Sequence, residues 1–144
     1  MSSLMWEPFS EPARHAIVRA QEVAQMFGAR SIATAHIAFA LAETDDDVGH
    51  LFANALDRAA MRELLGSVSA APREEMVFSD GAKRSIEYAF RAARQLGHGY
   101  IGVAHLAIGV LDSGDPPPAA PGVDVSTLRT ELQRAAGGDD PSRN

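Results

Sequence analysis

Two long stretches of the chain place apolar residues at intervals of three and four positions, which is the spacing of one face of an α-helix. The first stripe covers residues 13–27 and the second covers residues 82–96, and a glycine suited to ending a helix follows each one. Ser10 and Ser79 stand just before the stripes, where a serine side chain caps the first turn. The pattern therefore predicts two long amphipathic helices that begin at these serines.

A short and almost wholly apolar run follows each stripe, and a helix that is apolar on all sides belongs in a protein interior. Thr34 is placed to cap the first of these runs, and Ser126 is placed to cap a last helix. The shorter predicted helices cover residues 35–42, 48–55, 57 to about 68, 103–112 and 126 to about 136. No segment alternates apolar and polar residues between turn signals, so we predict an all-α fold of about seven helices.

The two long stretches belong to an internal duplication. Residues 9–41 align without a gap onto residues 78–110, and eleven positions are identical. Alanine makes up five of them, but Phe-Ser, Gly, Ile and His at fixed spacing are much less expected by chance. We therefore predict two pseudo-symmetric repeats packed into one globular domain. The predicted boundaries are 1–137 for the domain, about 6–68 and 76–136 for the repeats, 69–75 for the linker, and 138–144 for a polar tail.

After residue 112 the two copies diverge. Where the first repeat has its third predicted helix, the second has residues 113–122, which contain three successive prolines. Each proline lacks a backbone donor and clashes with the preceding turn, so this segment cannot be helical. We predict a polyproline-like surface loop.

Composition narrows the classes of function. A length of 144 residues fits one domain, and a net charge of −6 argues against a nucleic-acid binder and, more weakly, against an anionic membrane as partner. No apolar run approaches the length of a membrane span, and the first residues do not resemble a signal peptide. The chain has no cysteine, which agrees with a reducing cytoplasm and excludes thiolate chemistry. We expect a cytoplasmic protein.

The sequence offers few groups for catalysis. His36 and His105 are counterparts in the two repeats, but neither has metal-ligand spacing around it, so hydrogen bonding within the fold is the favoured role. The acidic run at residues 43–47 is better explained as a solvated helix cap than as a cation site. No Gly-x-x-x-x-Gly-Lys-(Ser/Thr) motif occurs, so a phosphate-binding loop of that type is absent. We predict no catalytic residue, no metal site and no cofactor.

One motif is specific enough to suggest a family. Both copies begin Phe-Ser-x-x-Ala-(Arg/Lys)-x-x-Ile-x-x-Ala, and the second continues with Ala-Arg-Gln-Leu-Gly-His at 93–98 and Gly-Tyr-Ile-Gly-x-x-His-Leu at 99–106. Together with the entry into the last helix, these residues resemble the Clp N-terminal repeat domain of Hsp100/Clp unfoldases, of the ClpC and ClpA type. The resemblance covers about residues 6–136 and implies a recognition module that binds adaptors and substrate segments for an ATPase ring. The chain is then either a stand-alone repeat protein, which Met1 and the polar tail favour, or a fragment of a longer unfoldase.

The resemblance also implies a place for the ligand. In the family, a groove near the two repeat starts binds peptides and cyclic-peptide antibiotics, and a Clp ATPase or protease system is the implied partner. The candidate groove residues here are Trp6, Phe9, Ser10, Arg14, Phe78, Ser79, Lys83 and Glu87. For Phe9 and Phe78, a hydrophobic staple on the following helix is at least as strong an interpretation as ligand contact.

Two functions therefore remain in view. The first is a non-enzymatic module that recognises peptide or adaptor segments in protein quality control. The second is a decoy that sequesters small molecules or adaptors aimed at a full-length unfoldase. Family members usually carry a glutamate before the repeated histidine, where this chain has Ala35 and Ala104. Alanine offers no acceptor to a guanidinium, which argues against recognition of phosphoarginine.

Overall fold

The computed structural model describes residues 8–66 and 77–138. This part of the chain forms seven α-helices and no strand longer than an isolated bridge, which confirms the all-α prediction. The helices are α1 (Glu11–Met26), α2 (Thr34–Ala42), α3 (Asp47–Ala55), α4 (Arg58–Leu65), α5 (Asp80–Gln95), α6 (Val103–Asp112) and α7 (Val125–Ala135). The predicted linker 69–75 lies outside the described residues, as do residues 139–144 of the predicted tail.

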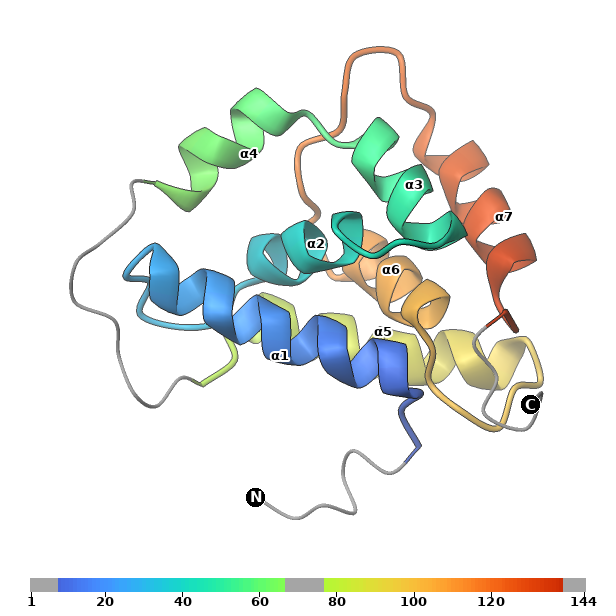
Figure 1. Ribbon diagram of the computed structural model, residues 1–144. Coiled ribbons are helices and arrows are strands. Elements are labelled where there is room, and N and C mark those ends of the chain that lie inside the picture. Colours follow the sequence, from blue (N-terminus) through green and yellow to red (C-terminus); the bar gives the residue numbers. More distant parts are fainter. Residues whose placement is uncertain (1–7, 67–76, 139–144) are drawn as a thin grey trace.

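The helices form three layers (Figure 1). Helices α1 and α5 make one outer layer, α2 and α6 lie in the centre, and α3, α4 and α7 cover the other side. The central helices are the most apolar of the seven, and residues 103–110 of α6 are all buried. Burial on every side explains why these two helices lack an amphipathic stripe.

The duplication appears in the fold as an approximate two-fold symmetry with exchanged contacts. Phe9 forms a parallel bridge with Ile101, and Phe78 forms the matching bridge with Ile32. At the first junction Ser10 N donates to Ile101 O over 2.8 Å; at the second, Ser79 N donates to Ile32 O over 2.9 Å. The start of each repeat is therefore held by the connection inside the other repeat.

The ends of the long helices are as the sequence predicts. The hydroxyl of Ser10 accepts a hydrogen bond from Ala13 N over 3.2 Å, and that of Ser79 accepts one from Ala82 N over 3.1 Å. Each helix ends just before a glycine with positive φ, 67° at Gly28 and 74° at its counterpart Gly97. Local sequence thus determines both boundaries of α1 and α5.

Two predicted caps are wrong. Thr34 is the first residue of α2 and is fully buried, and Ala33 takes the N-cap position. The donor there is satisfied by His36, whose Nδ1 accepts from Ala33 N over 2.8 Å. Helix α7 begins one residue before Ser126, because the carboxylate of Asp124 accepts from Ser126 N over 2.9 Å and is the stronger cap.

The proline-containing segment is non-helical, as predicted, but it is more than a surface loop. Pro117 is buried, and Leu56 pairs with Ala119 in an antiparallel bridge. Asp57 N donates to Pro118 O over 2.9 Å, and Ala120 N donates to Ala55 O over 2.7 Å. The segment therefore fastens the corner between α3 and α4.

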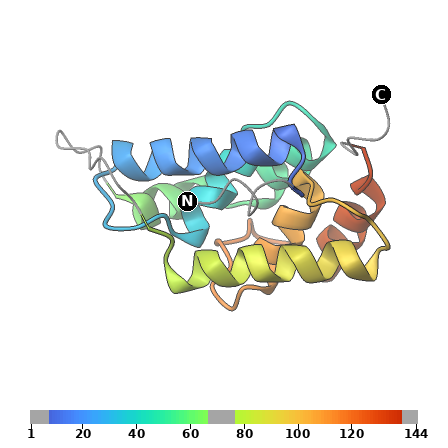
Figure 2. The same ribbon diagram turned by 90° about the horizontal axis from the view of Figure 1, so that it is seen from below.

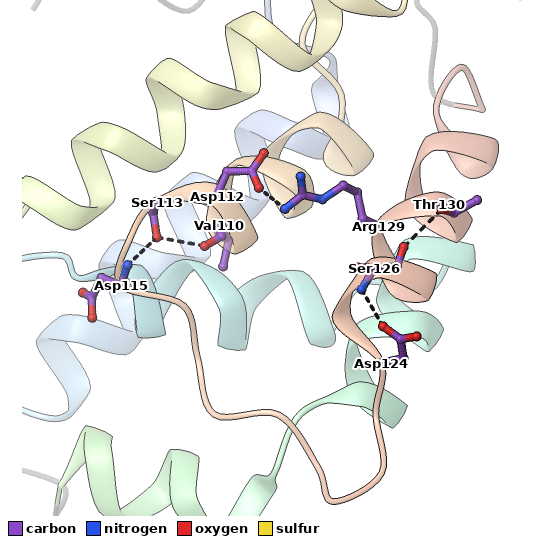
Figure 3. Close-up of polar contacts among 8 residues, drawn as sticks. All are labelled: Val110, Asp112, Ser113, Asp115, Asp124, Ser126, Arg129 and Thr130. Atoms are coloured by element: carbon purple, nitrogen blue, oxygen red, sulfur yellow. Dashed lines mark hydrogen bonds and ion pairs between the residues drawn. The ribbon is translucent and has the colours of Figure 1, made fainter.

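The ends of this segment are also fixed, as Figure 3 shows. At its start, the hydroxyl of Ser113 donates to Val110 O over 2.8 Å and accepts from Asp115 N over 3.1 Å. Asp112, at the end of α6, forms an ion pair with Arg129 of α7. These contacts hold α7 against α6 although the connection between them has no regular structure.

Candidate functional site

Most of the described residues at the start of the first repeat are buried within the fold. Phe9 and Ser10 are each only 1% exposed. The Phe9 ring meets Phe90 of α5 edge-on, with 5.7 Å between ring centroids and 80° between planes. Arg14 is exposed, and its Nε donates to Phe9 O over 3.1 Å. Phe9 thus contacts the long helix of the other repeat, and Arg14 is the described residue of this group that faces solvent. Trp6 lies outside the described residues.

At the start of the second repeat more of the predicted residues are accessible. Phe78 and Ser79 are half-buried, while Lys83 and Glu87 are exposed on successive turns of α5. Val77, which precedes Phe78, is 70% exposed and adds apolar surface beside these charges. This end combines an accessible apolar patch with charges of both signs.

The two repeat starts do not lie together. Figure 2 shows that α1 and α5 run in opposite directions, so Ser10 and Ser79 cap opposite ends of this layer. Each helix has 16 residues, which corresponds to a length of about 24 Å at 1.5 Å per residue. A ligand touching both starts must run along this layer, and an extended peptide needs about seven residues to span it. We call this layer the α1–α5 surface.

The paired histidines have the structural role expected of them. In each repeat a buried histidine at the third position of the central helix accepts, through Nδ1, from the residue before the helix: His36 from Ala33 N and His105 from Gly102 N, both over 2.8 Å. An imidazole thus replaces the usual side-chain cap. Burial lowers the pKa of His36, because desolvation disfavours the charged ring. The neutral form is the one that caps.

A cluster of rings distinguishes the second repeat. His105 Nδ1 accepts a hydrogen bond from the backbone, so its ring proton lies on Nε2, which donates a hydrogen bond to His98 Nδ1, 2.9 Å away. His98 also stacks on Tyr100 with 5.7 Å between centroids. In the first repeat Ala29 occupies the position of His98, so this arrangement exists only once. Sequence spacing could not reveal it, because the loop between the two histidines has to fold back.

A shallow cavity of about 210 Å³ lies beside this cluster, at the end of α5 nearest the start of α1. Pro8, Phe90 and Ile101 line its apolar side, and His98 and Tyr100 line the other. None of these five residues was among the predicted groove residues. They extend the α1–α5 surface at its otherwise buried end.

Residues 8–66 and 77–138 show neither the arrangement of a metal site nor that of a membrane-spanning helix. No group of three or more His, Asp or Glu side chains there is arranged to hold a metal ion. Among the described helices none is both long and apolar enough to cross a membrane.

Comparison with known proteins decides the family. The model of the Clp repeat (R) N-terminal domain matches residues 8–117 and 77–140. This chain belongs to the Clp repeat N-terminal domain family. It is 32% identical over 143 residues to the chloroplastic ClpA homolog of Brassica napus and, equally, to chloroplastic ClpC1 of Arabidopsis thaliana. In both cases 92% of this chain is covered, but only 16% and 15% of the relatives.

Solved structures agree on the fold of this Clp repeat domain. The N-terminal domain of the chaperone ClpD from Arabidopsis thaliana superposes with a TM-score of 0.66 at 24% identity, covering 93% of this chain and 97% of that one. The Hsp104 N-terminal domain from Candida albicans gives 0.65 at 17% identity, with coverages of 93% and 95%. The chain spans about a sixth of the length of the curated relatives that it matches.

Proposed function

We propose that this Clp repeat domain is a non-enzymatic module that recognises peptide segments or adaptor proteins in protein quality control. The observation that carries the proposal is the match to the Clp repeat N-terminal domain along nearly the whole chain, in relatives that are ATP-binding Clp subunits and chaperones by name. Its mechanism is equilibrium binding, and regulated proteolysis by a Clp ATPase or protease system is the implied process.

The α1–α5 surface is the proposed binding site. Lys83 and Glu87 are exposed on α5, and Val77, just before that helix, is 70% exposed. On α1, Val18 is 57% exposed. Apolar patches bordered by charges suit peptide segments. Phe9 is buried against Phe90 of α5, so its truncation reports on stability as well as on binding.

The test is affinity capture from a lysate of the source cell, read by mass spectrometry for proteins and small molecules. We compare the wild type with the double variant Lys83→Ala/Glu87→Ala. A matched control, Glu131→Ala/Arg134→Ala, also removes one charge of each sign from exposed positions, but on α7 in the opposite layer. Circular dichroism establishes that both variants stay folded.

The outcomes separate the two functions. Adaptors or substrates lost with the α5 variant and kept by the α7 control support recognition on the α1–α5 surface. Enrichment of a small cyclic peptide without any protein supports the decoy function instead. Capture that neither variant changes places binding elsewhere on the domain, and turnover of any captured molecule contradicts a non-enzymatic module.

A further inference from the structure

A cavity of about 270 Å³ lies between α2, α3 and α4. Phe39, Ala53, Leu56 and Met61 form its floor, with Leu56 and Met61 buried and the other two half-buried. Arg58 and Arg62 lie on its rim and are exposed. We call it the α4 cavity.

Its volume restricts what can enter. Pockets for drug-sized ligands measure about 300–1,000 Å³, so the α4 cavity is slightly smaller than the lower limit for such a ligand. It is large enough for one bulky side chain. An apolar floor of this size favours a single anchoring residue over a cofactor or a nucleotide.

The charges on the rim are unbalanced. Glu43 also lines the cavity, but Arg19 occupies both of its carboxylate oxygens, at 2.8 Å and 3.3 Å. Arg58 and Arg62 form no ion pair among the described residues. The rim is therefore positive in a chain of net charge −6, and its complement is a carboxylate.

Helix stability does not account for Arg58. Arg58 is the first residue of α4, where the helix dipole disfavours a cation. Arg58 and Arg62 are also four positions apart, and like charges at that spacing destabilise a helix by a few tenths of a kcal/mol. The dipole favours Arg62, which lies in the last turn of α4, but it does not favour Arg58. A cation at the disfavoured end of the helix, beside an apolar cavity, indicates a ligand of opposite charge.

The proline-containing segment makes the cavity rigid. Its backbone pairs with both sides of the α3–α4 corner, at Asp57 N to Pro118 O and Ala120 N to Ala55 O. The side chain of Asp57 then caps α4 by accepting from Ala60 N over 3.1 Å. A wall that is already ordered lowers the entropic cost of binding.

We propose that the α4 cavity binds a short peptide segment in which one bulky apolar side chain is flanked by carboxylates. The apolar side chain fills the cavity, and the carboxylates pair with Arg58 and Arg62. This site is separate from the α1–α5 surface and lies on the opposite side of the central layer, so either one can fail without the other.

The test uses three synthetic peptides and the full chain with isotope-labelled methionine methyl groups. The first peptide is acetyl-Glu-Asp-Phe-Asp-Glu-amide, the second has Ala in place of Phe, and the third has Lys at all four acidic positions. Met61 lies in the floor of the α4 cavity, while Met26 ends α1 and is 36% exposed. The NMR signal of Met61 therefore reports binding in the α4 cavity, and that of Met26 reports binding on the α1–α5 surface.

We expect the acidic Phe peptide to shift the Met61 signal and leave Met26 unchanged, with the Ala and Lys peptides binding at least about fivefold more weakly. Arg62→Glu should weaken the acidic peptide about fivefold, the upper end for an exposed ion pair. Arg30→Glu makes the same charge change at an exposed position away from the cavity and should have no effect. Circular dichroism verifies the fold, and Arg62→Gln replaces the glutamate variant if that unfolds.

Three kinds of result would overturn the proposal. One is an unchanged Met61 signal at millimolar peptide. Another is equal binding of the acidic and basic peptides, or equal loss in Arg62→Glu and Arg30→Glu. The third is a shift of Met26 alone, which places peptide binding on the α1–α5 surface and leaves the proposed function standing.

Discussion

Gly109 lies where α6 approaches α5 most tightly, and replacing it with alanine should destabilise the domain. A Cβ at this position would be 2.0 Å from Ser85 O and 2.9 Å from Ala89 N. Because carbon–oxygen contacts need about 3.3 Å, the helices would have to separate by roughly 1 Å. Overpacking costs about 1–3 kcal/mol or more, whereas alanine gains about 1 kcal/mol over glycine in a helix. The clash involves backbone atoms that cannot rotate away, so we expect a net loss of about 1–2 kcal/mol.

The other repeat provides an internal control. Ala40 occupies the position of Gly109 in α2 and is buried at 2% exposure, so the α1–α2 contact accommodates a methyl group. Ala40→Gly should therefore lose about 1 kcal/mol of helix propensity and contact. Gly109→Ala and Ala40→Gly are therefore each expected to lower the free energy of unfolding. Urea unfolding followed by circular dichroism measures both, through the midpoint at unchanged slope. A midpoint of Gly109→Ala equal to or above that of the wild type would refute the close packing of α5 and α6.

Three further predictions concern single side chains. Burial lowers the pKa of His36, so the unfolded chain takes up the proton first and the free energy of unfolding should fall as the pH drops below about 6.5. Urea midpoints measured between pH 8 and 5 should fall more steeply in the wild type than in His36→Asn. Equal slopes in the two proteins would contradict this prediction. Asp57→Ala should cost about 1 kcal/mol through loss of the α4 cap, seen as faster amide exchange at Ala60. Glu43→Gln should lower the free energy of unfolding, measured by urea, by less than about 1 kcal/mol, because its ion pair with Arg19 is exposed, at 41% and 40%. A larger loss would show that this ion pair stabilises the fold more than an exposed pair should.

The parts of the fold that sequence predicts are those determined by neighbours along the chain. Apolar spacing, serine caps and glycine ends establish α1 and α5 before any tertiary contact is known, and the repeated motif makes the two copies support each other. The predicted caps of α2 and α7, Thr34 and Ser126, are wrong for a physical reason. His36, the third residue of α2, does the capping there, and at α7 the carboxylate of Asp124, two residues before Ser126, takes the cap position.

The arrangement of the candidate site was beyond sequence reasoning because it depends on how the repeats meet. A motif places Phe9 and Phe78 at equivalent positions but does not say that α1 and α5 run antiparallel, which puts the two residues at opposite ends. Nor does it say that Phe9 is buried against Phe90 while Phe78 stays half-exposed. The α4 cavity is equally hidden, since it depends on backbone pairing between residues about 60 positions apart, Asp57 and Pro118.

The exchanged junctions explain which layers of this Clp repeat domain are tied together. Backbone hydrogen bonds cross between the repeats at both bridges, and a single repeat would leave these donors and acceptors unpaired beside an exposed core. The junctions involve only the starts of α1 and α5 and the connections to α2 and α6, so two layers are constrained together. The third layer, with α3, α4, α7 and the proline-containing segment, lies outside that constraint. It is also where the repeats depart from symmetry and where the α4 cavity forms.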